Sequence, residues 1–349
     1  MPTPRGWRRL LVALVGAAGL ALLLLSRQLR PPEAPLPAAA GARTVLPYHD
    51  SFEYLLNSPV CGGEEEVRAV IVVHSDPRRP EVRQAIRDSL PAAELAQLGL
   101  RRAFMLAEAS TRLREDEVTI AQLEIAEESA LHGDVVQGNF HDSYHNLTYK
   151  HIMALDWAIT FCPQARHIIK MDDDIVYNVY ELVKVLHFVP SARYLGGNVF
   201  PAAAPYRGNS KWRVSRADWP RQYYPPYVSG WLYIASQDVA RALVMQSTVV
   251  PFFWIDDVYV TGILAEQLHV TVRGLNRLFA TSANCTRHET RQEVPGPSPS
   301  PAAAYLPSVV VAPSDRDLAA LRAFNRLCRY CRGRPCGRRR RPAVCSNGL

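Results

Sequence analysis

One short stretch constrains the fold more than any other: an apolar run, three consecutive aspartates and a helix-start signal. Residues 168–171 are predicted to form a buried strand, and Asp172, Asp173 and Asp174 follow it directly. Asn178, with a glutamate three residues later and apolar residues at helical spacing, predicts a capped helix. The triplet is thus expected beyond the carboxyl end of a strand, where ligands bind in open α/β sheets.

Three adjacent carboxylates repel one another, and a bound divalent cation would relieve that repulsion. Carboxylate oxygens suit hard ions such as Mg²⁺ or Mn²⁺, and such an ion could hold a diphosphate. A solvated acidic loop would have the same three residues, so the flanking pattern has to decide between the two interpretations.

A second acidic pair, Asp256 and Asp257, follows a hydrophobic run at the start of a predicted helix. The helix dipole alone favours acids at that position. Near an apolar wall and a second acidic cluster, however, such a carboxylate is a candidate general base.

Strand-like and helix-like stretches alternate through the middle of the chain. The predicted strands are 69–74, 103–107, 134–140, 168–171, 194–200 and 231–235, and the predicted helices include 81–90, 115–132, 151–161 and 237–247. This alternation predicts an α/β fold with a mostly parallel central sheet and helices on both faces.

The formal net charge of +7 is distributed unevenly. Eight arginines without an acid in residues 326–341, and six arginines against one glutamate in residues 1–43, leave residues 44–325 at −6. An acidic body of this kind argues against nucleic-acid binding.

The N-terminal region predicts a membrane anchor. Residues 10–25 are uninterruptedly apolar or glycine, three arginines precede them, and no small-residue cleavage site follows, which favours a type II signal anchor over a cleaved signal peptide. The expected organisation is a cytosolic tail (1–9), a transmembrane anchor (10–25), a stem (26–66), a folded body (67–292) and a C-terminal extension with an Arg/Cys-rich tail (293–349).

Seven cysteines in a lumenal chain favour disulfides, and their odd number leaves at least one unpaired within the chain. The Cys328-x-x-Cys331 spacing could instead bind zinc, although disulfides are preferred in a lumen. Asn146 and Asn284 lie in N-glycosylation acceptor patterns.

Two further patterns each allow two interpretations. Arg83 and Arg87 lie four residues apart on one helix face, which either meets an anionic substrate or forms solvated salt bridges. The aromatic and proline-rich stretch 223–230 either stacks on a sugar or base, or packs as an irregular core loop.

The chain resembles the β1,3-galactosyltransferase and β1,3-N-acetylglucosaminyltransferase family of inverting Golgi glycosyltransferases. Five separated blocks, in the family's order, carry the resemblance: residues 83–89, 140–150, 170–178, 224–230 and 256–259. The chain departs from the family pattern at Leu90, where a Trp is usual, at Val228, where a Cys is frequent, and at Trp231 and Leu232, where small residues are usual.

The resemblance implies a GT-A fold and a metal-assisted reaction with a UDP-sugar donor. By this carry-over Asp174 ligates Mn²⁺ (or Mg²⁺) directly, while Asp172 and Asp173 support the metal, the ribose or the sugar. A late histidine commonly completes the metal shell in this fold, and His288 is the nearest candidate.

The resemblance also assigns the remaining roles. Asp257 would deprotonate the acceptor hydroxyl in a single in-line displacement, with Asp256 as the alternative base. Arg83, Arg87 and Lys150 would lie near the nucleotide.

The function implied is β1,3-transfer of galactose from UDP-galactose to a glycan on a glycoprotein or glycolipid, in the Golgi lumen. The alternatives are the same chemistry with UDP-N-acetylglucosamine, and a lumenal glycan-binding protein that kept the fold without catalysis. The intact acidic clusters favour an enzyme.

Overall fold

The computed structural model describes residues 53–63, 66–109, 115–291, 305–332, 336–338 and 342–345, all within the unit Thr44–Leu349. The predicted anchor (10–25), the cytosolic tail and most of the stem lie outside these residues. Among the described helices, none is long and apolar enough to cross a membrane.

An eight-stranded sheet forms the centre of the unit, with strand order β1-β4-β3-β2-β5-β8-β7-β9. The strands are β1 (Tyr54–Leu56), β2 (Val67–His74), β3 (Leu100–Glu108), β4 (Val135–His141), β5 (Ala165–Asp172), β7 (Leu195–Phe200), β8 (Tyr227–Ser236) and β9 (Arg273–Gly274). β4, β3, β2 and β5 are parallel, whereas β8 is antiparallel to both β5 and β7. The predicted α/β class with a mostly parallel sheet is confirmed, and the antiparallel direction of β8 was not predicted.

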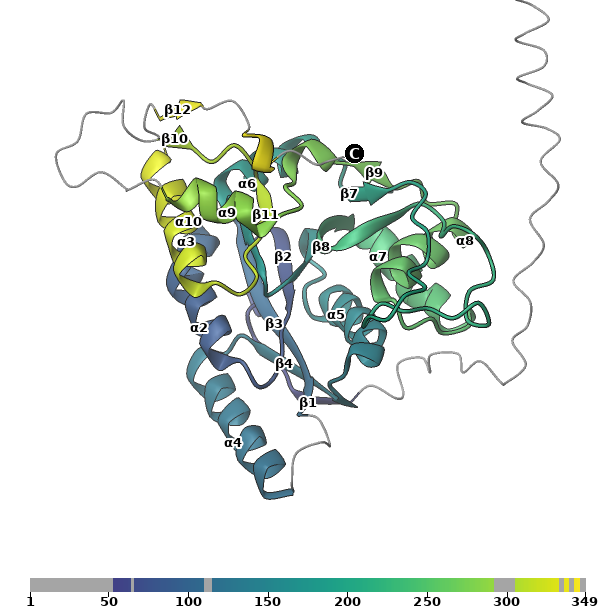
Figure 1. The fold of residues 1–349 in the computed structure, drawn as a ribbon. Coiled ribbons are helices and arrows are strands. Elements are labelled where there is room, and N and C mark those ends of the chain that lie inside the picture. Colours follow the sequence, from purple (N-terminus) through teal and green to yellow (C-terminus); the bar gives the residue numbers. More distant parts are fainter. Residues whose placement is uncertain are drawn as a thin grey trace, which may run out of the picture. The chain divides into compact units, whose positions relative to one another are not determined.

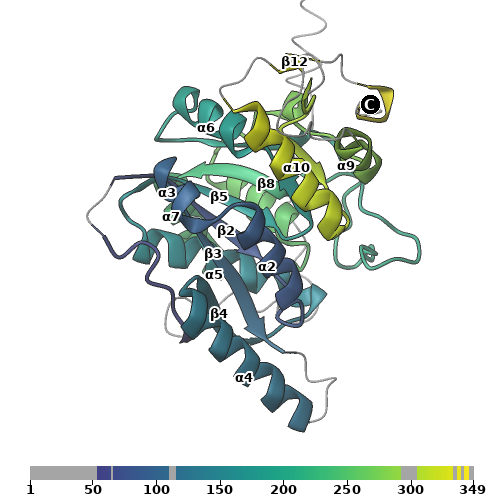
Figure 2. The same ribbon diagram turned by 90° about the vertical axis from the view of Figure 1, so that its left-hand side faces the viewer.

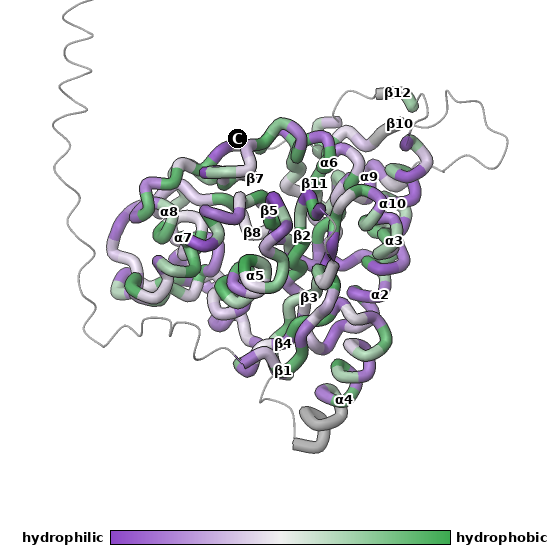
Figure 3. The backbone as a smooth tube through the Cα atoms, turned by 180° about the vertical axis from the view of Figure 1, so that it is seen from behind, coloured by the Kyte–Doolittle hydropathy of each residue, from purple (hydrophilic) through white to green (hydrophobic). Residues whose placement is uncertain are grey.

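Helices cover both faces of this sheet (Figures 1 and 2). One face carries α2 (Pro80–Ser89), α3 (Ala92–Gln97), α4 (Glu115–His132) and α10 (Leu318–Cys331), and the opposite face carries α5 (Leu147–Phe161) and α7 (Gln237–Ser247). Because β2 and β3 are covered on both sides, their central residues, 69–73 and 103–107, are apolar and buried (Figure 3).

The remaining elements are short or lie at the sheet margins. They are η1 (Tyr144–Asn146), β6 (Ile175–Tyr177), α6 (Val179–Phe188), the π-helix η2 (Val258–Leu264), α8 (Ala265–Gln267), η3 (Asn276–Leu278), α9 (Ala283–Thr290), β10 (Tyr305–Leu306), β11 (Val311–Pro313), β12 (Gly337–Arg338) and η5 (Ala343–Cys345).

The predicted cap after the acidic triplet forms in part. The Asn178 side chain accepts hydrogen bonds from the backbone N–H groups of Tyr180 (3.2 Å) and Glu181 (3.3 Å), so it starts α6. The reciprocal half of the capping box is absent, because the Asn178 N–H donates to the Val310 carbonyl at 2.8 Å. A segment far away in the sequence therefore completes this helix start.

The C-terminal residues belong to the same core as the rest of the described unit. β11 pairs antiparallel with β6, and α10 packs along α2. Leu321 and Phe324 on α10 are buried in the cluster that also contains Ile71 and Ile169 from the central strands. The extension predicted from residue 293 thus contributes β11 and α10 to the central core.

The cysteines form three disulfides, Cys61–Cys162, Cys285–Cys345 and Cys331–Cys336, and leave Cys328 buried and unpaired. This arrangement agrees with the preference for disulfides over zinc in the tail. Asn284 is exposed on α9, whereas Asn146 is partly buried and its amide donates to the His141 carbonyl, so glycosylation at either position stays a prediction.

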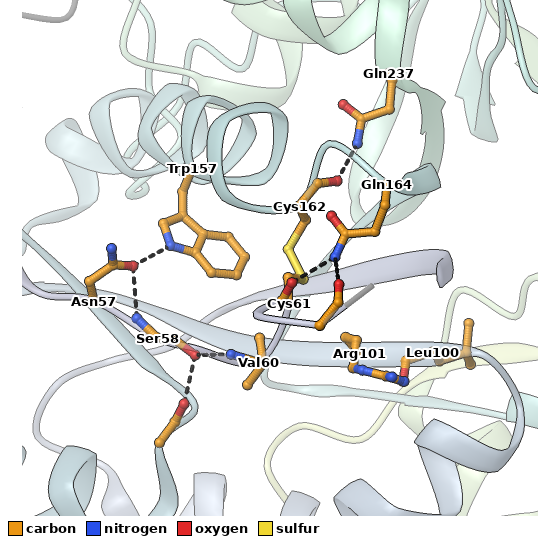
Figure 4. Close-up of a disulfide and its surroundings, with 12 residues drawn as sticks. Asn57, Ser58, Val60, Cys61, Leu100, Arg101, Trp157, Cys162, Gln164 and Gln237 are labelled. Atoms are coloured by element: carbon orange, nitrogen blue, oxygen red, sulfur yellow. Dashed lines mark hydrogen bonds between the residues drawn. A yellow bond between two sulfur atoms is a disulfide. The ribbon is translucent and has the colours of Figure 1, made fainter. Parts of the chain in front are cut away.

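The Cys61–Cys162 disulfide ties the segment that carries β1 to the end of α5 (Figure 4). Hydrogen bonds from Trp157 to Asn57 and from Gln164 to the Cys61 carbonyl support the same attachment. The disulfide closes a loop with a sequence separation of 101 residues, and cross-linking a long loop removes the most entropy from the unfolded chain.

Replacing both Cys61 and Cys162 by Ser is therefore expected to lower the free energy of unfolding by about 2–4 kcal/mol. The matched control replaces Cys331 and Cys336, which are separated by only 5 residues, and should cost clearly less. Urea denaturation of both double variants measures the difference in the free energy of unfolding. Equal losses would contradict the larger stabilisation expected from the Cys61–Cys162 disulfide.

Candidate active site

The sheet topology brings both acidic clusters to one cavity. β5 ends at Asp172 beside the last residue of β2, and the antiparallel β8 begins at the same edge. The cavity has a volume of about 440 Å³, and Asp172, Asp174, Asp256 and Asp257 all line it. A larger hollow of about 810 Å³ lies between α6 and β9, but no carboxylate is among its lining residues.

A buried ammonium group connects the two clusters. The Lys170 Nζ donates to Asp172 Oδ1 (2.6 Å) and to the Gly230 carbonyl (2.7 Å), and it lies 3.9 Å from Asp256 Oδ2. Lys170 is only 1% exposed, and the neighbouring carboxylates outweigh its burial and raise its pKa, so it is a fixed positive charge. Sequence analysis gave this lysine no role, because it lies inside an apolar strand.

Asp256 is held by an internal chain of hydrogen bonds. Its Oδ2 lies 2.9 Å from His151 Nδ1, and His151 Nε2 lies 2.6 Å from the Tyr233 hydroxyl. Because a carboxylate can only accept, Nδ1 carries the proton and Nε2 accepts from Tyr233. Although burial opposes it, the hydrogen bond from His151 and the charge of Lys170 lower the pKa of Asp256 to about 2.

Asp257 is in a different electrostatic situation. Burial and the charge of Asp256 raise the pKa of Asp257 to about 7, although its carboxylate accepts from the Gly230 N–H (3.2 Å) and the Val258 N–H (2.8 Å). A Cβ at Gly230 would lie 3.0 Å from Lys170 Nζ, so the glycine leaves room for the ammonium beside Asp257. Asp257 also starts the π-helix η2, a type of segment that is frequent at functional sites.

The aspartates of the triplet divide between two directions. Asp172 and Asp174 line the cavity, whereas Asp173 is 1% exposed and its Oδ2 accepts from Ser75 Oγ at 2.9 Å. Burial, with the charges of Asp174 and Asp256, raises the pKa of Asp172 to about 7. Burial and the charge of Asp173 also raise the pKa of Asp174.

These groups fit a hard divalent cation. The donors at the cavity are carboxylate oxygens, which Mn²⁺ and Mg²⁺ prefer, and both Asp172 and Asp174 carry pKa values that a nearby cation would lower. His288 is exposed on α9 and is not among the residues that line this cavity, so its place in a metal shell stays a prediction. Cys285, Glu289 and Cys345 lie close together, but the two cysteines are joined as a disulfide.

Of the three basic residues predicted to lie near the nucleotide, Lys150 and Arg83 are at the edge of the sheet where the acidic triplet lies. Lys150 Nζ donates to the Ser75 carbonyl and to Asp142 Oδ1, both at 2.8 Å. Arg83 donates to the Asp76 carbonyl at 2.6 Å and to Glu128 Oε1 at 2.8 Å. Ser75 itself contacts Asp173, so Lys150 and Arg83 support the end of β2 next to the triplet.

Arg87 is not bonded to the end of β2; it shares Glu128 with Arg83. Its guanidinium binds Asp134 and Glu128, each at 2.7 Å, and packs over the Phe104 ring. Of the two predicted alternatives for the Arg83–Arg87 face, the solvated one is wrong in one respect: the salt bridges form, but they are buried. Contacts of either arginine with a nucleotide stay predictions.

Aromatic rings form the other wall of the cavity. Those lining it are Tyr144, Phe200, Tyr206, Trp212, Tyr224, Tyr227 and Trp231. Tyr224 packs on Trp219 and Phe253, whereas Tyr227 stacks on Phe200 with centroids 5.3 Å apart. The predicted aromatic loop thus both packs in the core and faces the cavity. Tyr206 and Trp212 were missed, because residues 201–222 show no regular periodicity.

Comparison with known proteins gives a consistent set of relatives. A family model described as Galactosyltransferase matches residues 81–276. Beta-1,3-galactosyltransferase 5 of Pan troglodytes is 34% identical over 212 residues, covering 59% of this chain and 68% of that protein. UDP-GalNAc:beta-1,3-N-acetylgalactosaminyltransferase 1 of Sus scrofa is 36% identical over 234 residues, covering 64% and 67%.

Beta-1,3-galactosyltransferase 2 of Homo sapiens is 31% identical over 228 residues, covering 64% of this chain and 52% of that protein. The chain therefore spans between about half and two thirds of the length of the relatives it matches.

The opposite pKa shifts of the two neighbouring aspartates predict opposite effects on stability. In metal-free protein, Asp257→Asn is expected to raise the midpoint of thermal unfolding at pH 8, because the folded state no longer holds a carboxylate that it disfavours. Wild-type stability attributable to Asp257 falls as pH rises from about 4 to about 7, so the gain should shrink at pH 5. Thermal scans with EDTA at both pH values measure this.

The control is Asp256→Asn, for which a loss of about 1–3 kcal/mol is expected, because it removes the charged partner of His151 and one of the two carboxylates beside Lys170. The stabilisation from Asp256 is present above about pH 4 and declines as pH falls toward its folded pKa of about 2. Destabilisation of the same size in both variants at pH 8 would contradict the assigned roles.

Proposed function

Because the chain belongs to the galactosyltransferase family and is a glycosyltransferase, we propose that it transfers galactose from UDP-galactose to a glycan hydroxyl, forming a β1,3 linkage with inversion. The observation that carries this proposal is the pair of acidic clusters at one cavity, which Asp257, a carboxyl of raised pKa, lines together with Asp172 and Asp174. The mixed α/β sheet fits the GT-A fold that this activity implies.

Asp257 serves as the general base in this proposal. A pKa of about 7 places the carboxyl near neutral pH, where a base can both be ionised and hold a proton. The acceptor hydroxyl gives its proton to Asp257, and its oxygen attacks the anomeric carbon as the bond to the nucleotide breaks. One displacement of this kind inverts the anomeric centre.

Asp256 supports the base without taking the proton. Its carboxylate is hydrogen-bonded to His151 and lies near the Lys170 ammonium, and its low pKa makes it a poor proton acceptor near neutral pH. That same negative charge raises the pKa of Asp257, so the adjacent acids have different tasks. Tyr233 and His151 fix the orientation of Asp256 from the core side.

Asp174 and Asp172 would hold Mn²⁺ or Mg²⁺, with Asp173 holding the end of β2 in place through Ser75. When bound, the metal supplies a Lewis acid that neutralises charge on the diphosphate. Lys170 keeps Asp172 oriented, since its ammonium binds one oxygen and leaves the other for a ligand.

The relatives' names favour galactose as the donor sugar, since several are β1,3-galactosyltransferases and one transfers N-acetylgalactosamine. An N-acetylhexosamine donor needs additional room beside the sugar ring. Trp231 lines the cavity directly after Gly230, and its indole occupies space there. We also propose a Golgi membrane protein with a lumenal catalytic unit, on the basis of residues 10–25.

Asp257→Asn is expected to lower turnover of UDP-galactose by about 100-fold or more, because a positioned general base contributes about 10²–10⁴-fold. The fragment Thr44–Leu349 with Mn²⁺ and a panel of glycan acceptors provides the assay. Asp238→Asn, an exposed acid at the start of α7, is the matched control and should keep wild-type turnover. Full activity in Asp257→Asn would remove it from the mechanism.

Trp231→Ala is expected to raise the turnover of UDP-N-acetylhexosamines relative to UDP-galactose by about tenfold, within the 10–200-fold that steric pockets discriminate. Trp212→Ala, which removes a second indole from the same cavity, is the control and should leave this ratio unchanged. A donor screen with both variants measures the ratio, and wild-type preference for UDP-N-acetylglucosamine would overturn galactose as the donor.

A further inference from the structure

Residues 311–317 lie against the acidic triplet although they are outside the matched family segment, residues 81–276. β11 pairs with β6 so that Pro313 faces Ile175, the residue directly after the triplet. The next N–H, that of Ser314, donates to the carbonyl of Asp174 at 2.7 Å. This segment is therefore bonded to the backbone of the proposed metal ligand.

A tight turn at Asp315 and Arg316 follows, and the Arg316 side chain contacts Asp173 of the triplet. Asp315 and Arg316 have φ values of 52° and 58°, a left-handed conformation that residues with a Cβ adopt rarely. The turn is held on both sides: the Arg316 N–H donates to Ser314 Oγ at 3.3 Å, and Asp317 caps α10 by accepting from the Ala320 N–H at 3.0 Å. Such strained turns cluster at functional sites.

The Arg316 guanidinium uses only part of its hydrogen-bonding capacity. Its Nε donates to Asp173 Oδ1 at 3.2 Å, while its two Nη groups have no acceptor within the part of the chain that the structure describes. The Arg316 side chain is 39% exposed whereas the side chain of its partner Asp173 is 2% exposed, so the guanidinium reaches solvent while the carboxylate is buried. The two oxygens of Asp173 have different partners: Oδ2 accepts from Ser75 Oγ and Oδ1 accepts from Arg316 Nε, so the arginine also pairs with this buried carboxylate.

The charges around Arg316 indicate what it could bind. Although partial burial opposes it, the charges of Asp173, Asp174 and Asp76 raise the pKa of Arg316, which therefore stays positively charged. A guanidinium presents paired N–H donors that match two oxygens of a phosphate. Next to a proposed divalent cation site, the ligand with such oxygens is the diphosphate of the nucleotide-sugar donor.

We propose that Arg316 binds the donor diphosphate and stabilises the negative charge that develops on it. This inference rests on the proposed function. In the reaction, the bond between the anomeric carbon and the β-phosphate oxygen breaks, and its electron pair stays on that oxygen. The acceptor oxygen forms the new bond and its proton goes to Asp257, so the nucleoside diphosphate leaves with the charge that Arg316 faces.

Nucleotide binding by the full chain tests this without relying on turnover. Titration calorimetry with UDP and with uridine, each with and without Mn²⁺, compares wild type with Arg316→Gln. The dissociation constant for UDP is expected to rise about tenfold or more, as for loss of a charge-assisted hydrogen bond, whereas that for uridine stays unchanged. Arg316→Lys keeps the charge but not the fork, and should be intermediate.

Arg287→Gln is the matched control, because Arg287 binds Asp315 of the same turn at 3.3 Å and is 44% exposed. It removes the same charge and should leave UDP binding within about twofold of wild type, since exposed ion pairs contribute little. Equal losses in Arg287→Gln and Arg316→Gln would reduce the effect to general electrostatics and overturn the proposal.

Two other outcomes would also overturn it. If Arg316→Gln weakens UDP and uridine binding by the same factor, Arg316 acts only by positioning Asp173. If wild type and Arg316→Gln bind UDP equally, the phosphate contact is absent while the proposed function survives. A wild-type chain that does not bind UDP would reject the proposed function itself.

Discussion

The buried ammonium of Lys170 is the interaction on which the site depends. A fully buried cation is tolerated only with charged and hydrogen-bonded partners, and Lys170 takes them from three elements: Asp172 on β5, the Gly230 carbonyl on β8 and Asp256 before η2. Removing one partner of a buried ion pair costs about 3–5 kcal/mol. These three contacts of Lys170 therefore hold together β5, β8 and the residues before η2, which form the cavity.

Much of the fold could be predicted because its signals are local. The central parallel strands read as continuous apolar runs, and α7 was predicted with its observed bounds, 237–247. The direction of β8 could not be predicted, because it depends on the irregular connection 201–226. The helix α10 was not predicted, because residues 293–349 were interpreted as an extension beyond the folded body. Leu321 and Phe324 nevertheless lie in the core, and Arg329 binds Glu94.

The sequence predicted those site residues that form conspicuous acidic runs. It did not predict those that lie within helices and strands of ordinary core composition. Runs of aspartate are conspicuous, so the cavity-lining acids were found. His151 and Tyr233 lie in a helix and a strand that look like plain core, and only the fold shows that they hold Asp256. Asp173 was grouped with its neighbours, but successive residues point in different directions, and its side chain turns toward Ser75.

The separation of the acids between two elements has a stereochemical consequence for the proposed reaction. An in-line displacement requires the base and the leaving group on opposite sides of the anomeric carbon. Asp172 ends β5 beside the end of β2 and Asp174 follows two residues later, whereas Asp257 lies on a different connection and meets the sheet at Gly230 on β8. In the proposed reaction, Asp172, Asp174 and Arg316 would hold the diphosphate on the β2–β5 side, and the sugar would then lie between the two clusters. Attack assisted by Asp257 would then come from the β8 side, which is the arrangement that the proposed inversion requires.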